Sequence, residues 1–229
     1  DLGTPEVSGE PVTLTIDCVA VTAPAGTSIL RAAAVAGTTI PKLCATDSLE
    51  AFGSCRVCLV EIEGRAGSPA SRTTPVASGM VVRTRSDQLD RLRRNLVELY
   101  LSDHAADAVH GECELHDLAD ALGVGESRYA TGGASHQSLP CDASNPYFTF
   151  DPAKCIVCSR CVRACDEVQG TLALTVQGRG FASQIVASQD EPFLSSECVS
   201  CGACIQACPT EALIEKTVLE LGKPEWSEV

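Results

Sequence analysis

The chain has 229 residues, of which 45% are hydrophobic and 4% are aromatic. Its 30 acidic and 17 basic residues give a formal net charge of −13, which disfavours binding to nucleic acid or to an anionic membrane surface. The apolar runs are too short to span a membrane, so we expect neither a nucleic-acid nor a membrane partner. The first ten residues are polar and show no secretory signal pattern, and a reducing, cytoplasmic location is expected for so many unpaired thiols.

The N-terminal residues have the pattern of a small α/β unit. Its predicted elements are strands over 12–16 and 19–22, a helix over 29–36, and strands over 57–62 and 80–84. Thr27 or Ser28 is placed to cap the helix, and Gly37 is placed to end it. This order, with a cysteine loop after the helix, predicts a β-grasp domain of the plant-type ferredoxin kind over residues 1–85.

The loop after the predicted helix holds three cysteines in metal-binding spacing. They are Cys44, Cys55 and Cys58. A plant-type [2Fe–2S] cluster needs four ligands, but Arg72 stands where the fourth cysteine is expected, and arginine stays protonated in proteins. Ser71 and Thr73 offer only hydroxyl oxygens, and Cys18 lies on the opposite hairpin. Three interpretations stay open: a cluster with an unusual fourth ligand, a fold that has lost the cluster, or a misassigned or engineered residue 72.

Residues 86–144 are predicted to form a helical connector. Its first part, 86–103, is an amphipathic helix in which leucines recur at helical spacing and predict a buried stripe. The stripe consists of Leu89, Leu92, Leu96 and Leu99. The remainder, 104–144, is less regular and rich in Gly, Ser and His.

Within the connector, a few metal-binding side chains form an incomplete pattern. They are His104, His110, Cys113 and His116. The segment resembles the site at which one histidine and three cysteines hold an additional [4Fe–4S] cluster. Ala108 occupies one of the cysteine positions, however, and the stretch from 108 to 113 is shortened. We therefore expect ordinary polar histidines here rather than a third [4Fe–4S] cluster.

Two cysteine runs near the C-terminus share the spacing C-x2-C-x2-C-x3-C. They are Cys155, Cys158, Cys161 and Cys165, and Cys198, Cys201, Cys204 and Cys208. In two-cluster ferredoxins the first three thiolates of a run hold one [4Fe–4S] cluster and the fourth holds the other. The predicted ligand sets are therefore Cys155, Cys158, Cys161 and Cys208 for cluster A, and Cys198, Cys201, Cys204 and Cys165 for cluster B. Zinc favours two separated pairs, and disulfides at this spacing would be strained, so both fit the runs less well.

The two runs lie in a predicted two-[4Fe–4S] ferredoxin domain over residues 145–217, which makes the whole chain α+β in class. The insertion between the runs, 171–192, has the pattern of a β-hairpin, and residues 218–229 have the pattern of a linker. Cys18 and Cys141 have no metal spacing and are expected to be small buried residues.

Three segments together resemble a known family. They are residues 44–62 with the Cys-Arg-Val-Cys run, residues 99–104 ending in Ser-Asp-His, and residues 151–170 around the first four-cysteine run. They resemble the N-terminal iron–sulfur region of the catalytic subunit of soluble NAD-dependent formate dehydrogenases of the molybdenum or tungsten type. More distantly, they resemble the small diaphorase subunit of NAD-reducing hydrogenases and the related complex I subunit. The likeness covers nearly the whole chain, and residues 215–225 resemble the linker that leads into the pterin-binding domain of the formate enzymes.

The resemblance implies an electron relay within an oxidoreductase complex. Electrons from formate oxidation at a metal–pterin centre, in a partner domain or subunit, would pass singly through the two [4Fe–4S] clusters. They would then reach a flavin and NAD in a diaphorase subunit. No catalytic residue is identified in this chain. Asp166 follows Cys165 where Pro209 follows Cys208, which predicts unequal surroundings and unequal reduction potentials for the two clusters.

Two alternatives remain. One is that the chain serves as the relay subunit of an NAD-reducing hydrogenase, although the formate-type linker argues against it. The other is a docking module that has lost clusters, and the eight cysteines of the two C-terminal runs argue against that interpretation.

Overall fold

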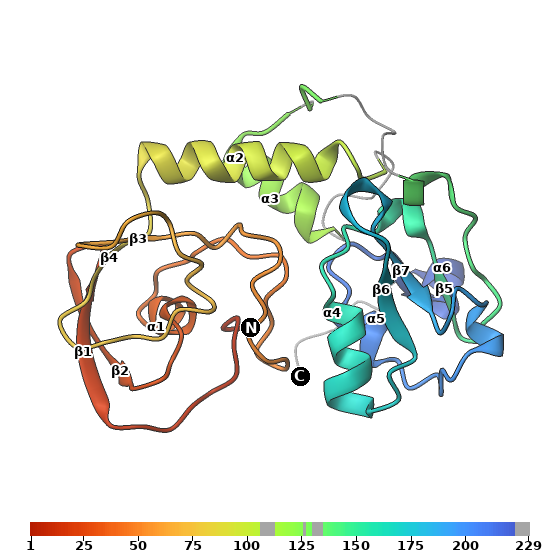
Figure 1. Ribbon diagram of the computed structural model, residues 1–229, viewed down its shortest axis with the longest axis horizontal. Helices are drawn as coiled ribbons and strands as arrows, with labels where there is room; N and C mark the ends of the chain where they lie inside the picture. The colour runs from red at the N-terminus through yellow and green to blue at the C-terminus, as the bar shows by residue number, and fades with distance from the viewer. Residues whose placement is uncertain (106–112, 126, 130–134, 223–229) are drawn as a thin grey trace. The chain divides into compact units, whose positions relative to one another are not determined.

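The computed structural model describes residues 1–105, 113–125, 127–129 and 135–222. The chain divides into two compact units, which are described separately (Figure 1). The first unit comprises Asp1–Tyr100 and Leu115–Arg128, and the second comprises Leu101–Glu114 and Tyr129–Val229.

The first unit is built on a four-stranded mixed sheet in the order β2-β1-β4-β3. Its elements are β1 (Pro11–Ile16), β2 (Val19–Pro24), α1 (Ile29–Val35), β3 (Glu61–Ile62), β4 (Val81–Arg83), α2 (Asp87–Leu101) and most of α3 (Glu114–Leu122). β1 pairs antiparallel with β2 and parallel with β4, and β3 pairs antiparallel with β4. Asp17 and Cys18 join β1 to β2 with φ values of 47° and 69°, the backbone of a tight hairpin turn.

The helix α1 begins and ends as the sequence predicts. The Ser28 hydroxyl accepts a hydrogen bond from the backbone N–H of Arg31 at 3.1 Å, and Gly37 takes a left-handed φ of 81° just after the helix. The buried face of α1, with Ile29 and Leu30, belongs to the same apolar core as the inward residues of the sheet. Aliphatic side chains make up nearly all of this core, and Cys58 is the one candidate ligand among its described members.

The helix α2 confirms the helix predicted over 86–103, but the prediction of a buried stripe of leucines is wrong. Leu89 is fully buried, yet Leu92 and Leu96 are only partly buried and Leu99 is 42% exposed. The buried positions that follow Leu89 at helical spacing are Arg93 and Val97.

Arg93 is buried because backbone oxygens receive its guanidinium. It donates to the carbonyl oxygen of Val57 at 3.3 Å and to that of Leu59 at 2.6 Å. These carbonyls are free of a strand ladder because the strand predicted over 57–62 forms only at Glu61–Ile62. The shortened strand therefore explains why the helix buries an arginine where leucines are expected.

The second unit is a small α+β unit that holds both C-terminal cysteine runs. Its elements are β5 (Phe148–Phe150), α4 (Arg160–Arg163), a π-helix (Ala164–Gln169), β6 (Leu174–Gln177), β7 (Gln184–Ala187), α5 (Ala203–Ala207), β8 (Leu213–Glu215) and α6 (Lys216–Leu221). The described residues also form 3₁₀ segments at Ser135–Ser138, Pro152–Lys154, Gly180–Ala182 and Phe193–Ser195. β5 and β8 pair antiparallel. β6 and β7 also pair antiparallel and confirm the predicted hairpin over 171–192.

The core of the second unit is formed partly by cysteines. The ring of Phe193 packs edge-on against Phe148 and Phe150, at centroid distances of 5.0 and 6.0 Å. The same buried cluster includes Cys155, Cys161, Cys165 and Cys204. The thiols that the sequence predicts as ligands are thus also core residues of this unit.

Cys18 and Cys141 differ from their prediction, because both are exposed. Cys18 is one of the two residues of the tight β1–β2 turn, so its side chain lies at the surface and not in the core.

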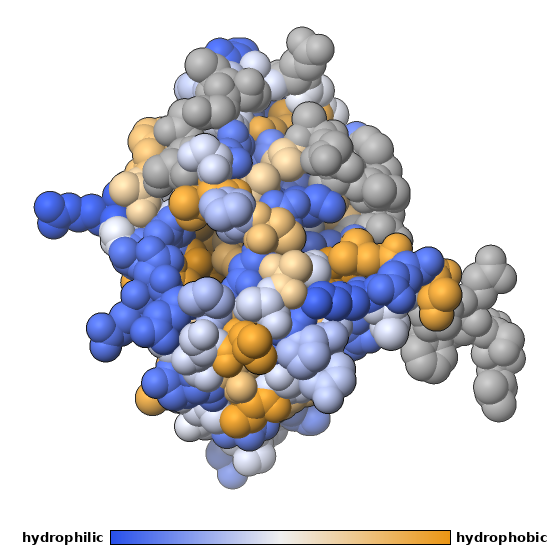
Figure 2. Space-filling view, turned by 90° about the vertical axis from the view of Figure 1, so that its right-hand side faces the viewer, coloured by the Kyte–Doolittle hydropathy of each residue, from blue (hydrophilic) through white to orange (hydrophobic). Residues whose placement is uncertain are grey.

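In the space-filling view, apolar residues form separate patches among hydrophilic ones (Figure 2). Over the described residues, no helix combines the length and the apolar character needed to cross a membrane.

Candidate iron–sulfur sites

The four predicted ligands of cluster B lie around one cavity in the second unit. Cys198, Cys201 and Cys204 line it together with Cys165, the last cysteine of the other run. The aromatic rings of Phe148 and Phe193 line the same cavity. A thiol from the first run therefore joins the three neighbouring thiols of the second run, in the grouping that crossed ligation requires.

The pKa of Cys204 responds to the other three predicted ligands of cluster B. Burial raises the pKa of Cys204 to about 12, and the neighbouring charges of Cys198, Cys201 and Cys165 add to that effect.

The first run shows the corresponding arrangement. Burial raises the pKa of Cys155, and the charges of Cys158 and Cys208 raise it further. Burial likewise raises the pKa of Cys161, and the charges of Cys158, Cys155, Cys208 and Cys204 raise it further. Cys208 also packs against the buried cluster that contains Cys155 and Cys161 of the first run.

The two cysteine loops share a backbone pattern. In the first loop, left-handed φ values occur at Val157 (51°) and Ser159 (62°), and in the second they occur at Ser200 (56°) and Gly202 (81°). These positions are equivalent in the two C-x2-C-x2-C runs. The pattern turns backbone N–H groups towards sulfur: Val157 N lies 3.3 Å from Cys155 Sγ, and Ser200 N lies 3.4 Å from Cys198 Sγ. Such donors stabilise negative charge on a ligating sulfur.

The fourth cysteines of the two runs have different surroundings. Cys165 lies in the π-helix and its Sγ is 3.2 Å from Thr171 Oγ1. Cys208 follows α5, and its Sγ is 3.9 Å from Thr210 Oγ1. These two threonines were not predicted, because nothing in the spacing of the cysteines marks them. The eight thiols, in two groups of four with N–H donors to sulfur, fit two [4Fe–4S] clusters.

A bidentate ion pair anchors one cysteine loop. Arg160, 3% exposed, lies between Cys158 and Cys161 and donates from Nη1 to Glu114 Oε1 at 2.7 Å and from Nη2 to Oε2 at 3.1 Å. The backbone N–H of Glu114 donates to the carbonyl of Pro209 at 2.8 Å, directly after the last cysteine. Glu114 therefore connects both runs within the second unit.

The three N-terminal cysteines are all buried in the first unit. The backbone N–H of Cys55 lies 3.4 Å from Cys44 Sγ. A hydrogen bond from the Cys55 thiol lowers the pKa of Cys44 and raises that of Cys55 itself. Cys44 Sγ also lies 3.2 Å from the carbonyl oxygen of Phe52, so the sulfur is surrounded by polar groups of its own loop.

Arg72 is buried beside these thiols and is only 1% exposed. Its Nη1 donates to the carbonyl oxygens of Cys44 and Phe52, the latter at 2.8 Å, and lies 3.4 Å from Cys44 Sγ. Its Nη2 donates to the carbonyl oxygen of Glu50 at 2.7 Å. A guanidinium stays protonated and offers no lone pair to iron, so the described residues supply three of the four ligands of a [2Fe–2S] cluster.

The hydroxyl groups that flank Arg72 are engaged elsewhere. Ser71 Oγ donates to the carbonyl oxygen of Cys58 at 2.8 Å, and Thr73 Oγ1 to that of Ala70 at 3.4 Å. Both hydroxyls are thus directed to backbone oxygens rather than to the thiols, and Cys18 lies in the exposed β1–β2 turn. The residues of this loop therefore do not fit a four-ligand cluster.

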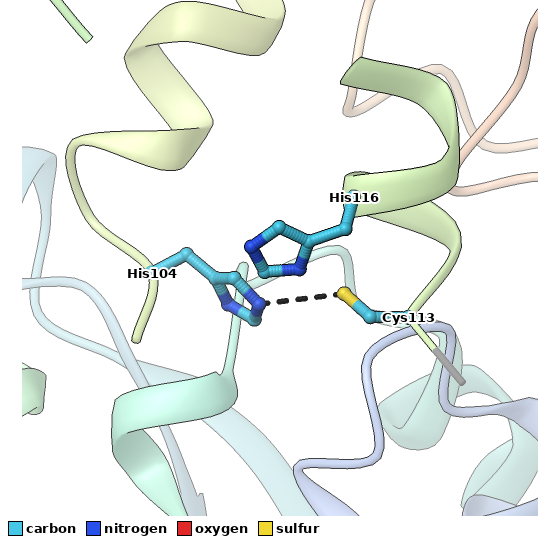
Figure 3. A group of neighbouring side chains, drawn as sticks. All are labelled: His104, Cys113 and His116. Carbon is cyan, nitrogen blue, oxygen red and sulfur yellow. Dashed lines mark hydrogen bonds between the residues drawn. The ribbon is translucent and has the colours of Figure 1, made fainter. Parts of the chain in front are cut away.

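Three side chains of the incomplete pattern in the connector lie close together, where ordinary polar histidines were expected. The Nε2 atom of His104 lies 3.4 Å from Cys113 Sγ, and His116 lies on the first turn of α3, which follows Cys113 (Figure 3). Ligand atoms of all three lie within 4.8 Å of one another. His110 and Ala108 lie outside the described residues. Two imidazoles and one thiol are donors that a single zinc ion accepts, but they are too few for a [4Fe–4S] cluster.

Comparisons with known proteins agree with this domain content. Residues 9–87 match the family model described as a 2Fe-2S iron–sulfur cluster binding domain, and residues 148–212 match the 4Fe-4S dicluster domain. A solved structure of an NAD+-reducing [NiFe]-hydrogenase in the H2-reduced state contains a similar chain. The two are 33% identical with a TM-score of 0.80, over 90% of this chain and 87% of that one.

Two curated relatives are longer than this chain. A subunit of the NADP-reducing hydrogenase of Solidesulfovibrio fructosivorans is 40% identical over 89% of this chain and 36% of its own length. A Staphylococcus haemolyticus protein named provisionally as a formate dehydrogenase is 29% identical over 83% of this chain and 19% of its own length. The chain thus spans about a third of the first and about a fifth of the second.

These matches define a class of iron–sulfur electron-transfer proteins that serve oxidoreductases. The chain belongs to the family of iron–sulfur modules found in NAD(P)-linked oxidoreductase complexes, hydrogenases and NADH-quinone oxidoreductase among them.

Proposed function

We propose that the chain is the electron relay of an NAD-dependent formate dehydrogenase. In this proposal, electrons pass between a metal–pterin formate site and a flavin and NAD site, both in partner domains or subunits. The observation that carries the relay is the cavity at which Cys165 joins Cys198, Cys201 and Cys204. The formate relative and the formate-type ending over residues 215–225 support the choice of substrate.

The proposal gives each part of the chain a role. Residues 1–85 form a β-grasp domain, 86–144 a connector, 145–217 the ferredoxin domain, and 218–229 a linker. Cluster A is held by Cys155, Cys158, Cys161 and Cys208, and cluster B by Cys198, Cys201, Cys204 and Cys165. Such clusters, when bound, accept and donate single electrons. A cytoplasmic location belongs to the proposal because ligating thiols must stay reduced.

The side chains of the second unit would hold and tune these centres. The N–H groups of Val157 and Ser200 donate towards ligating sulfurs, and the Thr171 hydroxyl lies beside Cys165. Phe148 and Phe193 line the cavity and would exclude water from that side of a bound cluster. Hydrogen bonding and exclusion of water are the means by which a protein sets the potential of such a centre.

A second candidate is the relay of an NAD(P)-reducing hydrogenase. Sequence identity favours it, since the hydrogenase relatives are 40% and 33% identical and the formate relative is 29% identical. Both candidates use the same relay and differ in the partner that supplies electrons.

Isolation of the native complex under anaerobic conditions separates the two candidates. An affinity tag on this chain retains its partners, and the visible absorbance of the iron–sulfur centres is then followed after addition of formate or of H2. The formate proposal expects bleaching by formate and a pterin with molybdenum or tungsten in the complex. Bleaching by H2 alone, with nickel in the complex, would replace it with the hydrogenase relay. A complex without iron–sulfur absorbance would remove both.

A further inference from the structure

Arg72 occupies the position at which a fourth thiolate would complete a [2Fe–2S] site. The backbone places it there, because Ser71 N donates to the carbonyl oxygen of Cys58 at 2.8 Å and Leu59 forms a bridge with Ala70. Residue 72 thus follows directly on a segment that is paired with the Cys55–Cys58 loop. The side chain then extends towards Cys44, the remaining cysteine of the site.

The guanidinium donates hydrogen bonds to carbonyl oxygens of the loop that would otherwise surround a cluster. Three carbonyl oxygens, those of Cys44, Glu50 and Phe52, accept hydrogen bonds from it. Moving Arg72 aside to admit iron and sulfide would leave the buried carbonyl oxygen of Cys44 and the part-buried carbonyl oxygens of Glu50 and Phe52 without this donor, which is unfavourable. The loop therefore accepts hydrogen bonds from both terminal nitrogens of the arginine, while its buried Nε has no hydrogen-bond partner among the described residues.

The charge of Arg72 also suits this role. A [2Fe–2S] site balances thiolate charge with iron, and here the guanidinium lies 3.4 Å from Cys44 Sγ. An arginine that is 1% exposed needs hydrogen-bond acceptors to remain buried, and carbonyl oxygens of residues 44–52 supply them. One side chain thus fills the place of a fourth ligand and hydrogen-bonds to the loop.

We propose that the guanidinium of Arg72 replaces a [2Fe–2S] cluster as the group around which residues 44–58 fold. The first unit then binds no iron, and electron transfer within this chain is confined to the second unit. The inference does not depend on which substrate supplies the electrons, because it concerns only the metal content of the first unit.

The substitution Arg72→Cys tests the proposal by restoring the fourth thiol. The 229-residue chain and its variant are purified anaerobically and reconstituted with iron and sulfide under identical conditions. We expect about eight irons per wild-type chain and about ten per variant chain, since a [2Fe–2S] cluster adds two irons. The reduced variant should also gain an electron paramagnetic resonance signal of the [2Fe–2S] type that is missing from the wild type.

Two controls identify the source of any added iron. Arg72→Lys keeps a positive charge without a thiol and should bind no more iron than the wild type. The double substitution Arg72→Cys with Cys58→Ala should lose the two irons gained by Arg72→Cys. A [2Fe–2S] signal in the wild type would overturn the proposal, and this measurement does not require any variant to fold. A folded Arg72→Cys protein with unchanged iron would overturn the claim that residue 72 excludes the cluster.

Discussion

The Cys44–Arg72 region and the Cys155–Cys208 region both gather buried thiols in loops, but different groups hold those loops. In the first unit, Arg72 and Arg93 donate to loop carbonyls, and a separate apolar core lies under the sheet. In the second unit, the cysteines themselves belong to the core. Backbone N–H groups point towards sulfur in both units, at Cys55 in the first and at Val157 and Ser200 in the second.

The difference shows that a cysteine loop can keep its fold in two ways. A cationic side chain of the protein can stabilise the loop by donating hydrogen bonds to it. Alternatively, a bound iron–sulfur cluster can stabilise the loop by joining its thiolates. The first arrangement makes folding independent of metal, and the second couples folding to metal binding. The comparison therefore leads to predictions about which region responds to loss of iron and which responds to loss of an arginine.

Iron removal should give the largest effect, and only in the second unit. A strong chelator applied to the reduced protein should release amide protection in β5, β8 and the two cysteine loops. Protection should be lost because the buried thiols there would no longer be joined by an iron–sulfur cluster. Amides of β1 and β2 should keep their protection, because their core contains no metal ligand of the second unit. Hydrogen exchange followed by mass spectrometry measures both units in one sample.

Re-addition of iron and sulfide to the same sample serves as the control and should restore protection in the second unit. Equal loss of protection in β1 and β5 would break the comparison, since it would mean that both units depend on metal.

Single removal of a fourth cysteine should give the next largest effect. Cys165→Ala should abolish the same spectroscopic centre as Cys204→Ala, and Cys208→Ala the same centre as Cys155→Ala. The reason is that each fourth thiol lies with the other run. Each variant should retain about four irons per chain. Iron analysis with electron paramagnetic resonance checks the pairing, and identical spectra for Cys165→Ala and Cys155→Ala would contradict the crossed arrangement.

Replacement of Arg72 by methionine should destabilise the first unit by about 2 kcal/mol, because the buried carbonyl oxygen of Cys44 and two part-buried carbonyl oxygens lose their donor. The exposed Arg65 provides a matched control, and Arg65→Met should change stability by less than about 0.5 kcal/mol. The free energy of unfolding is taken from amide exchange of β1 and β2 in increasing urea. A variant as stable as the wild type would show that Arg72 does not hold the loop.

The smallest effect should be a change in reduction potential from loss of one hydroxyl. Thr171→Val removes the hydroxyl 3.2 Å from Cys165 Sγ and should lower the potential of cluster B by on the order of tens of millivolts. The sign follows because a hydrogen bond to sulfur favours the more negative, reduced state. Thr210→Val, at 3.9 Å from Cys208 Sγ, should shift cluster A by less.

A redox titration followed by electron paramagnetic resonance measures both midpoints. An equal shift in the two variants, or equal midpoints in the wild type, would remove the idea that unequal surroundings separate the two clusters.

The sequence predicts those parts of the molecule whose spacing is fixed by chemistry. The hairpin of β1 and β2, the Ser28 cap and the hairpin of β6 and β7 all form as expected. The cysteine spacing also predicts the thiols that gather in the second unit. Local patterns of turns and ligands act over a few residues, so a single sequence reveals them.

The sequence does not predict features that depend on distant partners. The buried stripe of α2 contains Arg93 because carbonyls of Val57 and Leu59, more than 30 residues earlier, accept from it. The role of Thr171 depends on a fold that returns it to Cys165. α3 is not predicted although its signal is present in the sequence: Leu115, Leu118, Ala119 and Leu122 recur at helical spacing, and Leu115 and Ala119 are buried.

Mössbauer spectroscopy of the chain enriched in ⁵⁷Fe tests the central claim most directly, because it counts iron in each type of cluster separately. If the eight C-terminal thiols hold two [4Fe–4S] clusters and Arg72 replaces the third centre, all cluster iron should fall into [4Fe–4S] components. About one fifth of the iron in a [2Fe–2S] component would contradict the account of the first unit. Absence of [4Fe–4S] components would contradict the account of the second.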